Sequence, residues 1–285
     1  MATVKRAFVF LTCIFSGLAA VFTLVALVTE QWVVTDDARW TNGEVTEPNT
    51  IKYGLFQGYF AQQYPVSTTL QITMTCLLSE NVCALLCGRD QDERYTILRQ
   101  LYQNNPNATQ NNENCPALRG TFSYGRLPVS TYAADVNDDK KFINAGVWVS
   151  TIFFLALSIA VGLACAALSI WNTVANPVEA YFSIFGLYIY NAVALASVVI
   201  GMCLWGVMHL YVMFHNVGVF DTLAGNMTSD KTAHLGYSYW ILIIPVVFYC
   251  ASIALLYVRQ YLLSKDPGHK MVHREDTADP AIYLY

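Results

Sequence analysis

The chain has 285 residues, of which 55% are hydrophobic and only 13% are charged, and its formal net charge is −4. Globular domains carry about 25% charged residues. This composition, together with a mean hydropathy of +0.39, therefore favours a membrane protein over a soluble one. The negative net charge and the lack of a Lys- and Arg-rich run argue against a nucleic-acid-binding protein.

Four apolar stretches divide the chain, and each is long enough to cross a membrane as a helix. An α-helix rises about 1.5 Å per residue, so about 20 residues cover the ~30 Å hydrocarbon layer. Lys, Arg, Asp and Glu stand only at the edges of these stretches. The predicted transmembrane helices are residues 7–29, 145–170, 183–210 and 239–263.

The first stretch follows Lys5 and Arg6, so it also fits the start of a cleaved signal peptide. The apolar part of a signal peptide is about 7–15 residues long and ends at small residues. Here the apolar run continues past Val28 and ends before Glu30. We therefore expect a retained helix that follows a short cytoplasmic N-terminus, residues 1–6.

The loops and the basic residues together predict the orientation. Residues 30–144 form a long first loop, 171–182 a short connection and 211–238 a second loop. Basic residues near membrane ends favour the cytoplasm. Such residues precede the first helix and end or follow the fourth: Lys5, Arg6, Arg259, Lys265, Lys270 and Arg274. We therefore expect both termini, including the tail at 264–285, in the cytoplasm and both longer loops outside.

Sequons and cysteines in the loops agree with this orientation. Asn107 and Asn226 each begin a glycosylation sequon, one in each loop expected outside. The first loop also contains four cysteines: Cys76, Cys83, Cys87 and Cys115. Disulfides persist in oxidising compartments, and an even count fits two bridges with three possible connectivities. A zinc site is the weaker alternative, because the loop has no Cys-x-x-Cys pair and no His.

Within the first loop, local patterns predict a small folded domain. Apolar and polar residues alternate over 69–76, which predicts a strand with one buried face. The aromatic, Gly-containing segment 53–60 is a candidate second strand. Residues 90–93 resemble a capping box, and apolar residues then follow at helical spacing, which predicts a helix over 90–103.

Together these elements define the predicted fold class. We expect a membrane all-α protein, in which a four-helix transmembrane bundle carries a small disulfide-stapled α+β extracellular domain. This domain is formed mainly by the first loop.

Residue patterns that carry enzymatic chemistry are scarce. None of the five histidines stands in an HExxH pattern, and no nucleophile elbow, Walker loop or dinucleotide fingerprint occurs. Ion and proton paths normally contain intramembrane ionisable residues, and these helices contain essentially none. Packing explains Asn191 and Pro245. We therefore expect no enzyme, no cofactor, no metal and no transporter acting alone.

Small residues recur at every fourth position in two of the predicted helices. This spacing lets helix backbones approach closely. The positions are Ser158, Gly162 and Ala166 in the second helix and Ser197 and Gly201 in the third. We expect them to pack the bundle internally, and a homo-oligomer face is the alternative.

The last residues of the tail predict a cytoplasmic partner. The chain ends in Tyr283, Leu284 and Tyr285, with aromatic side chains at the last and third-last positions. PDZ domains capture a terminal carboxylate and read alternate side chains of the added strand. Hydrophobic endings are also frequent by chance. A PDZ-type scaffold is the partner this ending favours.

Several of these residues resemble the claudin-like tetraspan superfamily. In that superfamily a Trp follows the first helix, and a Gly-Leu-Trp element and two cysteines then lie on an extracellular sheet. Trp32, Gly54, Leu55 and the first-loop cysteines match this order. Phe56 stands where the second Trp would be, and the first loop is unusually long.

The closer resemblance is to the clarins. Their Tyr-Gly-Leu-Phe motif is similar to the segment from Tyr53 to Phe56. Asn172, Pro177 and Glu179 match an element that precedes their third helix, and the Leu-Tyr ending is shared. The resemblance covers the four helices and the C-terminus, whereas residues 83–141 look like an expansion.

The resemblance implies a non-enzymatic plasma-membrane glycoprotein of sensory cells. Clarins are tied to hair-bundle maintenance, mechanotransduction, ribbon synapses and actin organisation. On this basis we expect membrane lipid around the helices, an extracellular or membrane protein partner at the first loop, and a location in a cell projection or synapse. The alternatives are an auxiliary subunit of an ion channel and a claudin-like cell-junction barrier protein, although the long first loop disfavours the close lateral packing of a barrier.

Overall fold

The computed structural model describes residues 2–40, 49–62, 67–88, 90–103, 142–174, 182–218 and 227–265. The chain divides into two compact units. The first unit comprises Met1–Val21, Leu157–Ala196 and Ile244–Tyr285, and the second comprises Phe22–Ala156 and Ser197–Ile243. We call the second the sheet unit, because it contains every described strand.

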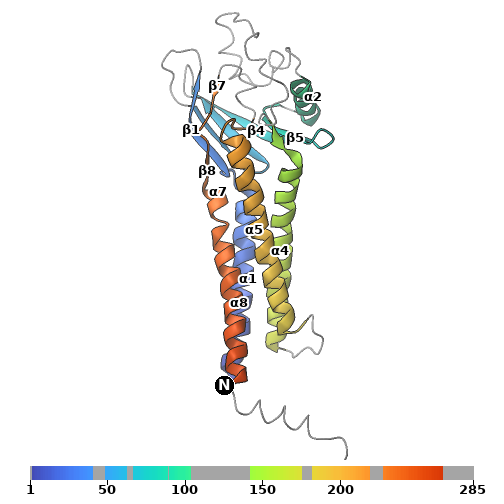
Figure 1. Cartoon of the computed structure of the whole chain (residues 1–285), viewed down its shortest axis with the longest axis vertical. Coiled ribbons are helices and arrows are strands. Elements are labelled where there is room, and N and C mark those ends of the chain that lie inside the picture. Colours follow the sequence, from blue (N-terminus) through green and yellow to red (C-terminus); the bar gives the residue numbers. More distant parts are fainter. Residues whose placement is uncertain are drawn as a thin grey trace, which may run out of the picture. The chain divides into compact units, whose positions relative to one another are not determined.

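Four helical segments in the described residues are long and apolar enough to cross a membrane, which confirms the predicted fold class. The main helices are α1 (Ala2–Val28), α4 (Ala145–Val174), α5 (Ile184–Met208) and α8 (Ile243–Ser264). In the first unit, their segments lie side by side (Figure 1). A short π-helix, η2 (His209–Met213), follows α5, and α7 (Tyr237–Trp240) precedes α8.

The helix ends differ from the predicted limits for local reasons. The helix α4 continues to Val174, beyond the predicted end at residue 170. The fourth segment begins earlier, at Tyr237, and is interrupted between α7 and α8. The interruption precedes Pro245, which has no N–H and whose ring crowds the carbonyl four residues earlier. At the end of the third segment the Phe214 N–H donates to the His209 carbonyl over 2.8 Å, which is the wider π-helical turn.

A hydrogen-bonded polar group holds three helices of the first unit together. The Ser16 hydroxyl of α1 donates to Asn191 Oδ1 of α5 over 2.9 Å. Asn191 Nδ2 donates to Cys165 Sγ of α4 over 3.0 Å and to the Leu187 carbonyl over 2.8 Å. All of these side chains are buried. Hydrocarbon supplies no hydrogen bonds, so polar side chains inside a bundle must be satisfied by each other.

Gly162 of α4 lies at a tight contact between helices in the first unit. The Tyr249 hydroxyl of α8 occupies the position that a Cβ at Gly162 would take, and the Ala20 Cβ lies 3.4 Å from that position. The same hydroxyl donates to the Ser158 carbonyl over 3.3 Å. Ser158 and Gly162 are both buried, which supports internal packing for this small-residue stripe.

We predict that Gly162→Ala destabilises the protein by about 1–3 kcal/mol, because the added methyl overpacks the contact with Tyr249. The matched control is Gly17→Ala, where the nearest atom to the added Cβ is the Ala166 Cβ at 4.0 Å. Thermal unfolding in detergent measures both. Combining Gly162→Ala with Tyr249→Phe should restore part of the loss. Equal melting temperatures for the two alanine variants would contradict this account.

The sheet unit contains an antiparallel sheet of eight strands in the order β6-β5-β4-β3-β2-β1-β7, with β8 also paired to β1. The strands of the first loop are β1 (Val33–Trp40), β2 (Asn49–Tyr53), β3 (Gln57–Gln62), β4 (Thr68–Leu77), β5 (Val82–Leu86) and β6 (Ile143–Asn144). The second loop contributes β7 (Met227–Thr228) and β8 (His234–Leu235). Strand β1 therefore joins the two loops.

The structure confirms two of the predicted first-loop elements and corrects one. Strand β4 covers the alternating segment, and α2 (Gln91–Tyr102) covers the predicted helix. Asp90 is the N-cap of α2, but its side chain makes no capping hydrogen bond. A single strand over 53–60 is wrong, because β2 ends at Tyr53 and β3 begins at Gln57 with a turn between them. The aromatic composition of this segment did not indicate the reversal.

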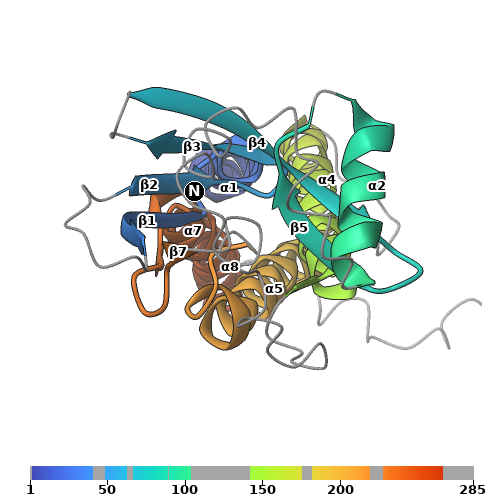
Figure 2. The same ribbon diagram turned by 90° about the horizontal axis from the view of Figure 1, so that it is seen from above.

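Helix α2 covers one end of the sheet, against β4 and β5 (Figure 2). Its buried residues Ile97, Leu98 and Leu101 pack in one cluster with Leu77, Val82, Ala84 and Leu86 of the two strands. Each of the five residues of β5 is buried, so this strand has no exposed face. The covering helix explains why the β5 sequence lacks polar alternation.

Candidate functional site

Buried aromatic rings join the sheet to the helix ends within the sheet unit. Trp32, which directly precedes β1, lies edge-on to Trp205 of α5 with a centroid distance of 5.6 Å. It also lies edge-on to Tyr239 of α7 at 6.1 Å. Trp32 and Trp205 are fully buried. Edge-to-face pairs of this kind add about 0.5–1.5 kcal/mol to the stabilisation from burial. We call this group and the strand ends bonded to it the junction.

Trp32 is hydrogen-bonded to three segments of the sheet unit. Its indole Nε1 donates to the Ala26 carbonyl in the last turn of α1 over 2.6 Å. Its backbone N–H donates to the Tyr53 carbonyl of β2 over 2.9 Å, and its carbonyl accepts from the Gly236 N–H over 3.0 Å. One residue therefore connects the end of α1, the sheet and the second loop.

The turn between β2 and β3 lies against two helix ends. Gly54 has no room for a Cβ, because the Thr29 backbone at the end of α1 occupies that space. The Leu55 carbonyl accepts a hydrogen bond from Trp148 Nε1 in the first turn of α4 over 2.7 Å. Phe56 lies edge-on to Trp148 at 6.5 Å and is 41% exposed. The turn therefore connects the start of α4 to the end of α1.

A disulfide staples the hairpin formed by β4 and β5. Cys76 and Cys83 are direct cross-strand neighbours and are bonded to each other. At the hairpin tip the side-chain Oδ1 of Asn81 accepts from the Gly146 N–H over 2.8 Å, which connects the tip to the start of α4. Cys87 is also disulfide-bonded, whereas Cys115 lies outside the described residues.

The second loop closes the sheet at both ends. Strands β7 and β8 pair with β1. The Gly218 carbonyl accepts from the Leu85 N–H of β5 over 3.3 Å. The hydroxyls of Thr35 and Thr232 are 2.8 Å apart and add a further link to β1. The sheet is thus curled, with its two ends bridged by one loop.

The buried part of the junction contains no Lys, Arg, Asp or Glu among the described residues, and the Glu30 carboxylate lies at its edge, where it accepts a hydrogen bond from Gln57 Nε2. The buried Tyr53 hydroxyl has no hydrogen-bond partner within the described part of the chain, and burial raises the pKa of this phenol. The phenol therefore stays neutral at physiological pH. Charged pairs lie at the periphery, where Lys52 is 3.6 Å from Asp36 and His215 is 2.8 Å from Asp230. The described residues contain no cluster of His, Cys, Asp and Glu able to hold a metal ion.

The structure brings together part of the residue set predicted from the sequence. Trp32 and the segment from Tyr53 to Phe56 meet at the junction. Asn172 belongs to the first unit, near the end of α4, where its Nδ2 donates to the Leu168 and Phe182 carbonyls over 2.8 and 2.5 Å. The remaining predicted positions lie outside the described residues: Asn107, Pro177, Glu179, Asn226, Tyr283, Leu284 and Tyr285.

Three residues of the junction were missed by the sequence analysis. Trp148, Trp205 and Tyr239 all lie near the ends of the predicted membrane helices. Aromatic residues are common at membrane interfaces, so their position alone does not distinguish a contact with the sheet from a contact with lipid. The Trp at the end of the first predicted helix is the one signal that points to this cluster.

The comparison with curated proteins identifies one relative. Over 107 residues the chain is 25% identical to human Clarin-3. The chain is thus distantly similar to Clarin-3. The match covers 37% of this chain and spans about half of that relative, 47% of its length. No family model matches the chain.

The clarin relationship agrees with the motif order noted in the sequence. The Tyr-Gly-Leu-Phe segment is a structural element of this clarin-like chain, because it forms the turn that holds β2 against the ends of α1 and α4. Its role at the junction is packing and hydrogen bonding. The geometry is that of a fixed connection between a sheet and a set of helices.

We predict that Trp32→Phe lowers the free energy of unfolding by about 2 kcal/mol, because the indole hydrogen bond is lost and a cavity remains. The matched control is Trp240→Phe. Trp240 also donates to a backbone carbonyl, that of Leu235 at 3.2 Å, but it is 53% exposed. We expect its loss to stay within about 0.5 kcal/mol. Thermal unfolding and limited proteolysis of the sheet measure both variants, and equal effects would contradict the central role of Trp32.

Removing the hairpin disulfide with Cys76→Ser and Cys83→Ser should destabilise the sheet unit by about 2.5 kcal/mol, from the loop-closure entropy of a short loop. The control is Cys203→Ser, since Cys203 is a free, exposed cysteine of α5. Proteolysis of the sheet with and without reductant reports the difference. If the double variant resists protease as well as the wild type does, the disulfide contributes nothing to the fold.

Proposed function

We propose that this protein is a non-enzymatic membrane organiser or adaptor of the clarin type. It resides in the plasma membrane with both termini in the cytoplasm. Its sheet unit faces outward and contacts a membrane or extracellular protein, and its tail binds a PDZ-type scaffold connected to actin. The clarin resemblance favours a sensory cell, where the protein maintains a projection or synapse and supports mechanotransduction.

The observation that carries this proposal is the charge-free interior. In the described part of the chain, the buried polar residues are Ser, Thr, Asn and His, and none is Lys, Arg, Asp or Glu. Paths for ions and protons normally contain several ionisable side chains, whereas His209 is the ionisable member of this buried polar set. The polar group around Asn191 is instead bonded within the bundle. These features support the role of a structural scaffold rather than that of a channel or transporter.

Two features support the outward orientation of the sheet unit. Its Cys76–Cys83 bond belongs to an oxidising compartment. Lys5 lies in the first turn of α1 and Lys265 directly follows α8, and basic residues at such helix ends favour a cytoplasmic side. Endoglycosidase treatment tests the orientation, because Asn107 and Asn226 can acquire glycans only if both loops enter the secretory lumen. A cytoplasmic reporter response from either loop would contradict it.

Proximity labelling from native tissue, with the labelling enzyme fused at the N-terminus, tests the organiser role. We expect membrane, matrix and scaffold proteins among the labelled neighbours. A stable association with one pore-forming protein, with altered currents on co-expression, would instead assign the chain as an auxiliary channel subunit. Solute flux in liposomes that contain only this chain would overturn the proposal.

We predict that deletion of residues 283–285 reduces the labelling of PDZ-type scaffolds at least about tenfold, since both the terminal carboxylate and the side chain read with it are lost. A matched variant adds one Ala after Tyr285, which keeps every side chain but displaces the carboxylate. It should lose the same scaffolds. Neighbours bound through the sheet unit should persist in both variants, and scaffold labelling that survives either change would exclude this mode of binding.

A further inference from the structure

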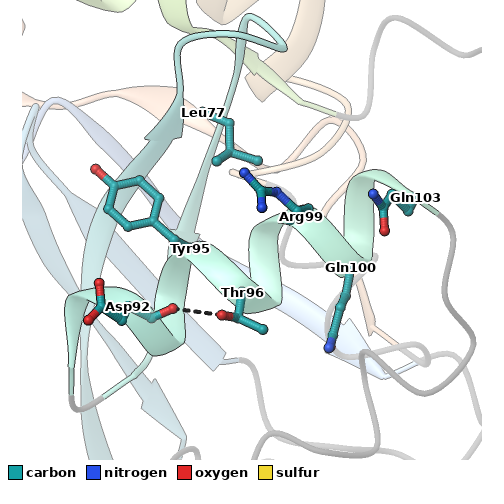
Figure 3. A pocket seen from close by; sticks show the side chains of 7 residues that line it. All are labelled: Leu77, Asp92, Tyr95, Thr96, Arg99, Gln100 and Gln103. Carbon is teal, nitrogen blue, oxygen red and sulfur yellow. Dashed lines mark hydrogen bonds between the residues drawn. The ribbon is translucent and has the colours of Figure 1, made fainter.

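Helix α2 presents a row of polar side chains around an open hollow on the sheet unit (Figure 3). The hollow has a volume of about 490 Å³ and is bounded on the strand side by Leu77 of β4. The helix residues that line it are Asp92, Tyr95, Thr96, Arg99, Gln100 and Gln103. We call this feature the α2 hollow.

The lining residues that belong to α2 are not part of the cluster that packs the helix on the sheet, whereas Leu77 of β4 belongs to both. The face of α2 that packs on the sheet consists of Ile97, Leu98 and Leu101, which are all buried. The lining residues recur at three- and four-residue spacing on the remaining surface of the helix. Asp92, Tyr95 and Arg99 are exposed. Their identities are therefore free to serve binding.

The α2 hollow combines one aromatic ring with planar polar groups of both kinds. The Tyr95 hydroxyl accepts a hydrogen bond from Gln91 Nε2 over 3.3 Å, which restrains the ring at the surface. Among the described residues, the Asp92 carboxylate and the Arg99 guanidinium have no ion-pair or side-chain hydrogen-bond partner. The carboxylate offers only acceptors, the guanidinium only donors, and the glutamine amides offer both. The hollow therefore offers both hydrogen-bond donors and hydrogen-bond acceptors next to the flat ring of Tyr95.

This chemistry selects among ligand classes. The charges of Asp92 and Arg99 cancel, which disfavours a phosphate or another strongly anionic group. A peptide held by its apolar side chains needs apolar pockets, and among the described lining residues Leu77 is the only aliphatic one. A saccharide presents hydroxyl groups that both donate and accept, and C–H groups that pack on an aromatic face.

We propose that the α2 hollow binds the saccharide chain of a neighbouring glycoprotein or glycolipid. Tyr95 stacks on one sugar ring, and Asp92, Arg99 and the glutamines bond to its hydroxyl groups. This inference rests on the proposed function in one respect, since it requires the sheet unit to face outward. It names the chemistry of one contact that the organiser makes there.

The test uses the full chain in lipid nanodiscs and a surface array of neutral and sialylated N-acetyllactosamine oligosaccharides. We expect retention of at least one saccharide, and a loss of affinity of about tenfold in Tyr95→Ala from the lost stacking. The matched control is Tyr102→Ala. Tyr102 lies on the same helix and is 40% exposed, but its ring packs on Phe142 at 6.2 Å, away from the hollow. The saccharide affinity of Tyr102→Ala should stay within about twofold of the wild-type value.

Three outcomes would overturn the proposal: no saccharide is retained, Tyr95→Ala and Tyr102→Ala lose affinity equally, or binding to a glycoprotein survives enzymatic removal of its sugars. The last outcome assigns the surface to a protein partner. If Tyr95→Ala lowers the melting temperature, the exposed Gln103→Ala replaces it and should weaken binding without affecting the fold.

Presenting the retained saccharide on albumin and, separately, on ceramide in phosphatidylcholine vesicles distinguishes a glycoprotein source from a glycolipid source. Proximity labelling of Tyr95→Ala cells separates this inference from the organiser role. If the wild-type protein labels scaffold neighbours but binds no saccharide on the array, the saccharide proposal is wrong. The organiser proposal is then unaffected.

Discussion

The burial of Trp32 at the end of α1 is the constraint on which the sheet unit depends. The last carbonyls of a helix have no partner within that helix, and near a bilayer an unsatisfied carbonyl is costly. The indole of Trp32 satisfies the Ala26 carbonyl. Because the side chain turns back onto its own helix, the chain enters β1 at the next residue, and the backbone bond to Tyr53 fixes the register of β2. Strands β3, β4 and β5 then pair in turn next to β2.

In the first unit, polar side chains are satisfied by hydrogen bonds to one another. Hydrocarbon offers no hydrogen bonds, so Ser16, Cys165 and Asn191 bond to one another across three helices. The small residues near them let the helices approach closely enough for these bonds. Where a backbone approach leaves a gap, as at Gly162, an aromatic hydroxyl from another helix fills it and bonds to the adjacent turn. Satisfied polar groups and close packing therefore reinforce each other.

Much of the architecture could be read from the sequence because the bilayer imposes a length. The four membrane segments, the alternating strand β4 and the amphipathic helix α2 each carry a strong periodic signal. Strand β5 carried none, because the sheet and α2 bury both of its faces. Strands β7 and β8 are two residues long and gave no pattern to detect.

At the junction, the sequence indicated the loop residues but not their partners on the helices. Trp32 and Gly54 were found through motif order. Trp148 and Trp205 were not, because an aromatic side chain near a helix end has the same sequence appearance whether it faces lipid or a strand. Only the folded chain shows that the Trp148 indole is committed to the Leu55 carbonyl.

The short strands at the two edges of the sheet affect the tendency of the protein to aggregate. The outermost strands, β6 and β7, are each two residues long, and β1 gains a further partner in β8. Long bare edges act as templates on which other chains add and grow into cross-β aggregates. Within the described residues this sheet offers no such template. The described edges of this sheet therefore leave short stretches of backbone for strand addition, and side chains make up most of the surface that the sheet presents.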